Sequence, residues 1–291
     1  MASAWESPAI EQQEEQEAYW DYGFGVGAVR YQQYLASNEF SYLAVPSPTF
    51  QYRGKILRAD DRDGAHIYLF KGNKLTVELS GEGYPALESS NSNARSGMED
   101  LPWVIALGPQ LVWRGIDDLE LGFGIYQATS TDFKMTRFAG QIYEARATYQ
   151  FGFPFESYGP FTQPGFSSAK ITLGLQGGSQ EFHSIYFGVP HENVTADRGA
   201  YDAHAGILDY SLTYYQTFKS GLFSISYGAT VHNYDLSANR DSDLHKSDHN
   251  VTGFVGINYV LGQSSKRAIP QDETSGIINS IRKNRDLRNS L

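Results

Sequence analysis

The chain has 291 residues, no cysteine and a formal net charge of −10. The lack of cysteine excludes a disulfide framework, a thiolate nucleophile and a cysteine-based zinc site, and the acidic balance argues against a nucleic-acid partner. The mean hydropathy is −0.42, and the sequence has no run of about 18 apolar residues, which excludes a transmembrane helix.

Tyrosine and glycine are both in excess of ordinary globular usage, with 20 Tyr and 29 Gly. Aromatic girdles and glycines on crowded inner faces are typical of outer-membrane β-barrels. An acidic soluble protein, kept in solution by its charge, is the alternative interpretation.

Residues 1–18 are rich in Glu and Gln, with Glu11, Glu14, Glu15 and Glu17 close together. We interpret them as a flexible or marginally helical lead-in with a solvated run of charge. They contain neither the basic nor the apolar part of a secretory signal. We therefore expect either a mature form or a protein that is not exported.

The first predicted strand covers residues 19–32, where Tyr22 and Phe24 alternate with Gly23 and Gly25. Its G-x-G-x-G spacing lacks the strand-to-helix context of a dinucleotide-binding fingerprint, so a strand with a smooth glycine face is the better interpretation. The same alternation predicts the next strands at residues 45–53, 55–60, 64–70 and 75–82.

Residues 102–127 predict the clearest antiparallel hairpin of the chain. Ile105 and Leu107 alternate with Val104 and Ala106 in its first arm, and the polar link at 114–118 is short. Each arm has about 10 residues or more, which is enough for a tilted strand to cross a bilayer core. A soluble sandwich could also contain such a hairpin. Further strands are predicted at residues 141–151, 170–178, 206–218, 222–231 and 251–261.

The lengths of the connections decide between the two architectures. Long connections are expected at one end of the predicted strands, at residues 84–101, 129–138, 183–204 and 235–250. Short connections are expected at the other end, at residues 71–74, 114–118 and 219–221. The link at 153–166 is long for the short side. Transmembrane barrels sort their connections in this way, and sandwiches have no reason to do so.

The sequence therefore predicts an all-β fold, an antiparallel transmembrane β-barrel. Twelve strands are expected, or ten if the pair at 55–60 and 64–70 lies outside the wall. We divide the chain into the acidic lead-in at 1–18, the barrel at 19–262 and a tail at 263–291, which is expected to emerge on the short-turn side, in the periplasm.

The tail has the pattern of a short amphipathic helix. Acidic residues precede it and basic residues lie near its end, as a helix dipole prefers. It is either a frayed end or a docking helix for a partner or for murein. The residues that would dock are Ile277, Ile278, Ile281, Arg282, Lys283, Arg285, Leu287 and Arg288.

Alternation places four charged side chains toward the barrel interior: Glu78, Glu120, Glu144 and Arg146. Such charges can line a path for small solutes, but in a narrow barrel they more often pair and plug the lumen. We favour the plugged interior.

Two other groups of residues carry weaker chemical signals. His245 and His249 lie among aspartates and contain metal-ligand types, but a solvated acidic loop is the better interpretation. His183 and Ser184, with Asp197 or Asp202, contain the residue types of a lipid-acting hydrolase. The sequence proximity of common residues is weak evidence for catalysis, so we expect no catalytic, cofactor-binding or metal-binding residues.

Several stretches resemble the MipA/OmpV family of Gram-negative outer-membrane proteins. They include YGFGVGAVRY, VPSPTFQYRG, SNARSGMEDLPW, YFGVP, AYDAHAGILDYSLTYY and VTGFVGINYVL. The resemblance implies a barrel without a catalytic site, a bacterial outer-membrane location in contact with lipid, and a scaffold role toward a periplasmic murein hydrolase or synthase. Some members are linked instead to adhesion or solute passage. The chain departs from the family by continuing about thirty residues beyond its last strand.

Overall fold

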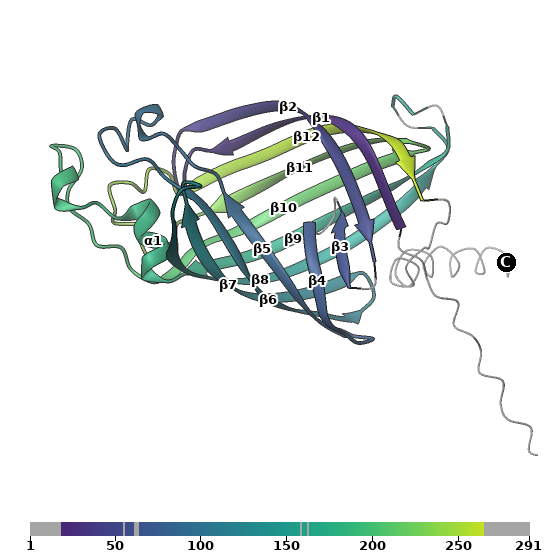
Figure 1. Ribbon diagram of the computed structural model, residues 1–291, viewed down its shortest axis with the longest axis horizontal. Coiled ribbons are helices and arrows are strands. Elements are labelled where there is room, and N and C mark those ends of the chain that lie inside the picture. The colour runs from purple at the N-terminus through teal and green to yellow at the C-terminus, as the bar shows by residue number, and fades with distance from the viewer. Residues whose placement is uncertain (1–18, 55, 61–63, 158, 162, 265–291) are drawn as a thin grey trace, which may run out of the picture.

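The computed structural model describes residues 19–54, 56–60, 64–157, 159–161 and 163–264. These residues form one closed barrel in which every strand pairs with its neighbours in sequence, and the last strand pairs with the first (Figure 1). The strands are β1 Tyr19–Gln32, β2 Phe40–Arg53, β3 Leu57–Asp60, β4 Gly64–Lys71, β5 Leu75–Tyr84, β6 Trp103–Ile116, β7 Leu119–Thr131, β8 Thr136–Phe155, β9 Gly165–Gly178, β10 Gly206–Ser220, β11 Phe223–Asn233 and β12 His249–Gln263.

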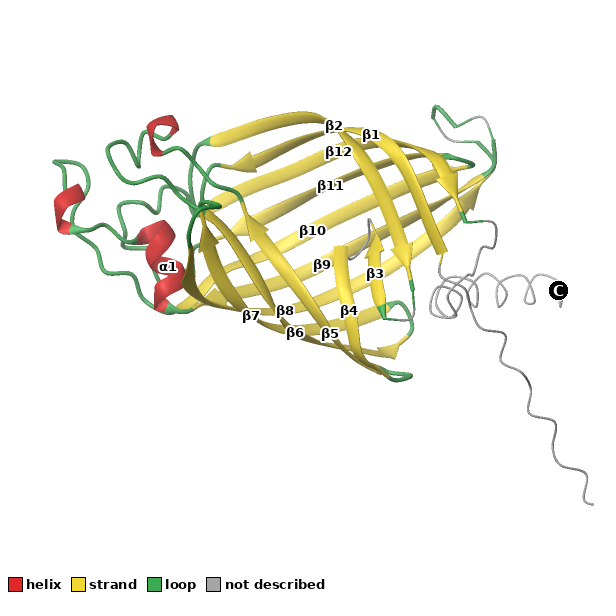
Figure 2. Cartoon of the chain, viewed as in Figure 1, coloured by secondary structure: helices red, strands yellow, loops and turns green. Residues whose placement is uncertain are grey.

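Three short helices lie beyond one end of the barrel, which we call the cap end (Figure 2). They are α1 Gln180–Phe187 and the 3-10 turns η1 Ser89–Asn91 and η2 His191–Asn193. The first and last strands begin and end at the opposite end, which we call the terminal end. Within the described part of the chain, no helix combines the length and apolarity that crossing a bilayer would need.

Closure of the barrel confirms the predicted antiparallel fold with twelve strands. β1 and β12 pair from Asp21 opposite Gln263 to Arg30 opposite Gly253. The short strands β3 and β4 pair with each other and with β2 and β5, so they belong to the wall and the ten-strand alternative is excluded. The predicted lead-in at 1–18 and nearly all of the predicted tail lie outside the described residues.

The barrel wall is apolar on its outside, the reverse of a water-soluble protein. Along β6, Ile105 and Leu107 are 45% and 57% exposed, whereas the alternating Val104 and Ala106 are fully buried. The same pattern runs along β7, where Phe123 is exposed and its neighbours are buried. An apolar outer belt on strands of 13 and 14 residues matches a bilayer, which supplies the missing apolar contacts.

The barrel wall has its shortest strand and its least strand pairing at β3. This strand has four residues and pairs with β2 only where Tyr52 faces Ala59 and Arg53 faces Arg58. β2 pairs with β1 along its whole length. Pro46 and Pro48 lie in β2, and a residue without an N–H donor suits a strand that is paired mainly on one side.

Several predicted boundaries were wrong. β2 begins at Phe40, five residues before the predicted start, and the link between β8 and β9 is shorter than 153–166 because both strands extend into it. The predicted long connection at 129–138 is a tight turn between Thr131 and Thr136. Its polar residues looked like a loop, but Asp132 Oδ1 accepts hydrogen bonds from the backbone N–H groups of Lys134 (2.9 Å) and Met135 (2.7 Å) and closes the turn.

Candidate functional site

The inner wall carries a network of charged and polar side chains on β4 to β8. Its centre is Glu120, which is buried and pairs with two arginines. Arg114 Nη2 lies 2.8 Å from Glu120 Oε2, and Arg146 Nη2 lies 3.4 Å from Glu120 Oε1. A buried carboxylate is costly unless it is paired, so these contacts are what allow Glu120 to lie inside the wall.

Gln110 extends this network to Glu78. With its amide nitrogen toward Glu78, it donates to Glu78 Oε1 (3.2 Å) and its oxygen accepts from Arg146 Nη1 (3.1 Å). His66 Nε2 lies 3.9 Å from Glu78 Oε2 at the far side of the network. The result is a continuous polar chain across neighbouring strands.

Of the four charged residues proposed for the interior, three join this network and one does not. Glu144 instead accepts a hydrogen bond from the Tyr126 hydroxyl (3.1 Å). Arg114 and Gln110 also belong to the network, although they are not among the residues predicted for the interior. Arg114 was assigned to a turn, but β6 continues to Ile116, so Arg114 keeps the alternation of Gln110 and shares its face.

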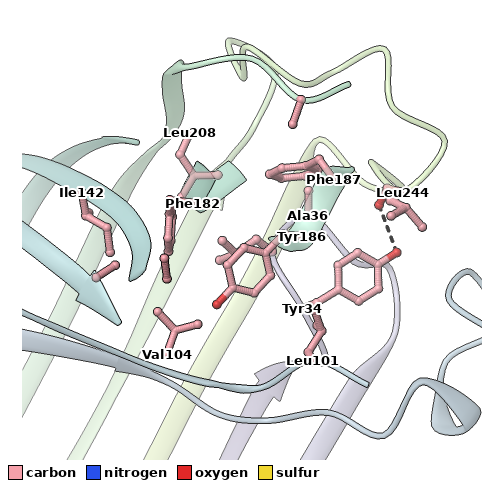
Figure 3. Close-up of a cluster of buried hydrophobic side chains, with 14 of the residues drawn as sticks. Tyr34, Ala36, Leu101, Val104, Ile142, Phe182, Tyr186, Phe187, Leu208 and Leu244 are labelled. Carbon is pink, nitrogen blue, oxygen red and sulfur yellow. Dashed lines mark hydrogen bonds between the residues drawn. The ribbon is translucent and has the colours of Figure 1, made fainter. Parts of the chain in front are cut away.

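The cap end is filled by four loops at residues 33–39, 85–102, 179–205 and 234–248, which we call the loop cap. Its buried apolar side chains pack on one another and on inward residues of the strands (Figure 3). From the loops these side chains are Tyr34, Leu35, Ala36, Leu101, Phe182, Tyr186, Phe187, Val189, Ala203, Tyr234 and Leu244.

Hydrogen bonds join all four loops of the cap. The joining pairs are Arg198 Nη1 to Ala94 O (2.8 Å), Ser242 Oγ to Phe187 O (2.7 Å) and Tyr34 Oη to Leu244 O (3.0 Å). Arg95 is also buried here, with its guanidinium 5.8 Å from the centre of the Tyr34 ring. Burial lowers the pKa of Arg95 to about 10, so it stays charged at neutral pH.

His183 belongs to the cap and not to a catalytic triad. It lies on α1, fully buried, and its Nδ1 donates to the backbone oxygen of His204 (2.6 Å). The neighbouring Ser184 is exposed, and its hydroxyl donates to Gln180 O (2.8 Å). The sequence predicts a loop at this segment, because eight residues are too few for a clear helical period.

His245 and His249 do not form a common site either. His245 Nε2 contacts Asp248 Oδ1 at 3.0 Å, whereas His249 begins β12. Across the ranges that the structure describes, no group of three or more His, Asp or Glu side chains is arranged to hold a metal ion.

A cavity of about 310 Å³ lies between the loop cap and the inner wall. Cap residues such as Tyr34 and Tyr186 form one part of its lining. The ends of β1, β5, β9, β10, β11 and β12 form the rest. Glu82 and Asp209 bring carboxylates to this lining. This cavity cannot be predicted from the sequence, because residues from widely separated strands form it.

The tail residues proposed for docking lie outside the described residues: Ile277, Ile278, Ile281, Arg282, Lys283, Arg285, Leu287 and Arg288.

Comparisons with known proteins give a solved structure with a low similarity score and a family. A solved porin structure is similar over 84% of this chain and 99% of that chain, with 9% sequence identity and a TM-score of 0.27. No curated protein matches the sequence. The family model described as "MltA-interacting protein MipA" matches residues 24–261, most of the chain and almost all of its barrel. The chain therefore belongs to the MipA family of outer-membrane β-barrels.

Proposed function

We propose that this protein is a non-enzymatic outer-membrane barrel that acts as an interaction scaffold for envelope or peptidoglycan-remodelling partners. The observation that carries the proposal is the loop cap, whose packed core occupies one end of the barrel. A barrel filled in this way is suited to anchoring more than to conduction. The family description, which names an MltA-interacting protein, supports a murein hydrolase as the class of partner.

The same proposal gives the barrel an orientation. Outer-membrane barrels place their long loops outside the cell and their short turns in the periplasm. The loop cap then faces outward, and the terminal end faces the periplasm. The tail would emerge there, beside murein and the enzymes that remodel it, with its apolar and basic residues available to a partner.

Co-purification tests the scaffold and the tail separately. The truncated form should end at Ser264 and not earlier, because Gln263 pairs with Asp21 and the Ser264 N–H donates to Trp20 O (2.8 Å). We expect an MltA-type transglycosylase to co-purify with the full chain in mild detergent and to be lost with the truncated form. Retention by both forms would move the docking surface to the barrel, and capture by neither would refute the scaffold.

A narrow solute pore is the second candidate, and the charges on the inner wall favour it. Glu120 and Arg146 would then line the path, together with Glu78 and Glu144. This function requires ion conductance in planar bilayers that changes when Arg146 or Glu120 is replaced.

A further inference from the structure

The cavity beneath the loop cap has the chemistry of a binding site. Its volume of about 310 Å³ is at the lower end of the range for small-molecule pockets. Tyrosines dominate its lining: Tyr31, Tyr34, Tyr84, Tyr186 and Tyr234. Tyrosine rings present a negative face, which attracts cations.

The charged groups of the lining are mainly acidic. Glu82 Oε2 accepts from the Tyr84 hydroxyl and from Gln176 Nε2, both at 2.8 Å. Asp209 Oδ2 lies 2.6 Å from His232 Nδ1. Among the described residues around the cavity there is no lysine or arginine, and His232 is the one basic side chain. The guanidinium of Arg95, in the cap, donates to the backbone oxygen of Tyr186 (3.4 Å).

A second observation points to a ligand. Tyr186 is only 3% exposed. Its hydroxyl is buried and has no hydrogen-bond partner among the described residues. A buried polar atom is normally satisfied, because leaving it unpaired costs free energy. In Figure 3 this hydroxyl points away from Leu244, toward the side of the cluster on which Val104 lies. Tyr186 also lines the cavity, where a ligand hydroxyl can bond to it.

We propose that the cap cavity binds a small alkylammonium cation that carries a hydroxyl group. The ammonium lies near Glu82 and Asp209, its methyl groups pack on the tyrosine rings, and its hydroxyl bonds to Tyr186. This inference goes beyond the scaffold role and does not depend on it, because the cavity lies at the cap end and the tail begins at the terminal end.

Calorimetry on the full-length protein in detergent tests the site with three probes. Choline has the charge, the methyl groups and the hydroxyl. The isomer of dimethylbutanol in which a carbon atom replaces the choline nitrogen is the uncharged isostere. Tetramethylammonium has the charge and the methyl groups but lacks the hydroxyl. We expect choline to bind with a dissociation constant below about 1 mM and dimethylbutanol to show no binding. Equal binding of the two, or binding of neither, would overturn the proposal without any variant.

Variants then test the individual residues. We expect Glu82→Gln and Asp209→Asn each to weaken choline binding by at least about tenfold, as for the loss of a hydrogen bond to a charged group. Tyr186→Phe should weaken choline binding but leave tetramethylammonium binding unchanged. Glu192→Gln, on the exposed surface of η2, is the matched control. Unchanged choline affinity in both carboxylate variants, with native circular dichroism, would show that the cavity is not the site.

Discussion

Gly108 lies on the inner face of β6, close against the backbone of β7. A Cβ atom built at this position would lie 1.9 Å from Ile125 O and 2.8 Å from Tyr126 Cα. Both are backbone atoms of the paired strand, so a side chain could be accommodated only if the strands separated. Gly83, in β5, has no heavy atom within 4 Å of the same built atom. Glycine therefore has a steric role at one position and none at the other.

We expect Gly108→Ala to destabilise the barrel by about 1–3 kcal/mol or more, the cost of overpacking against a rigid neighbour. Gly83→Ala should stay within about 0.5 kcal/mol of the parent. Urea unfolding in detergent, followed by far-ultraviolet circular dichroism, measures both. Equal midpoints for the two variants would contradict this account of Gly108.

His183 makes the loop cap sensitive to pH. Its Nδ1 donates to a carbonyl, and its Nε2 is buried without a hydrogen-bond partner in the described chain. A proton on Nε2 would therefore bury a charge with no acceptor. Burial lowers the pKa of His183 below its usual value near 6.5, and it also lowers that of His245.

We expect the cap to lose stability as the pH falls below 6.5. In that range an unfolded cap binds protons that the folded cap excludes, and the loss continues until the pH reaches the lower folded pKa values. The thermal midpoint of the near-ultraviolet circular dichroism signal, measured from pH 7.5 to pH 5, reports this change. His183→Gln should reduce the pH dependence and leave the part that is due to His245. An unchanged slope would exclude His183 as a cause.

Helix α1 is the element that holds the loop cap together. Its eight residues bring four buried side chains into the core, Phe182, His183, Tyr186 and Phe187. Phe187 is fully buried, with its ring 6.0 Å from that of His183 and 6.3 Å from that of His245. The strands below are held by their own ladders of hydrogen bonds, so the cap can open while the barrel stays closed.

Phe187→Ala should therefore loosen the cap without unfolding the barrel. Removing a buried phenylalanine ring costs about 3–5 kcal/mol, which here acts on the local opening of residues 179–205. Limited proteolysis should cleave this loop much faster in the variant, while far-ultraviolet circular dichroism stays unchanged. Ser184→Ala, on the exposed side of the same helix, is the control and should resist proteolysis like the parent. Global unfolding of Phe187→Ala would show that cap and barrel are one cooperative unit.

At the scale of the whole molecule, the closed wall and the loop cap together enclose the barrel interior. The wall separates the interior from lipid, and the cap fills one mouth of that interior. The polar network around Glu120 lies deeper, on β4 to β8. An ion that crosses the barrel must therefore pass both the cap and these charges.

We expect the intact protein to show no steady conductance in planar bilayers. Replacement of residues 181–203 by a short Gly-Ser linker should open a conducting path, and Arg146→Gln in that form should shift selectivity toward cations, because it removes a positive charge from the wall. The same linker inserted at Gly221, in the β10–β11 turn, is the control and should stay closed. Steady conductance of the intact protein would favour the pore over the scaffold.

The strands were predictable because their signal is local. One face of each strand meets lipid and the other meets the interior, so alternation such as Ile105 and Leu107 against Val104 and Ala106 is visible in the sequence itself. Two predicted strand boundaries were wrong because polar residues lie at the ends of those strands. The turn at Asp132 looked like a long loop, and Arg114 looked like part of a turn, although both strands continue there.

The sequence by itself determined the fold class and the face that each strand turns to lipid. It predicted twelve strands, but only the pairing of β3 and β4 with their neighbours excluded ten. Only the tertiary structure decided which interior side chains meet. Closure brings β1 beside β12, and the cap brings Tyr34, Tyr186 and Leu244 together from three loops. Periodicity reports the environment of one strand at a time, whereas the polar network, the loop cap and the cavity depend on contacts between residues far apart in the chain. Those contacts exist only once the barrel is closed.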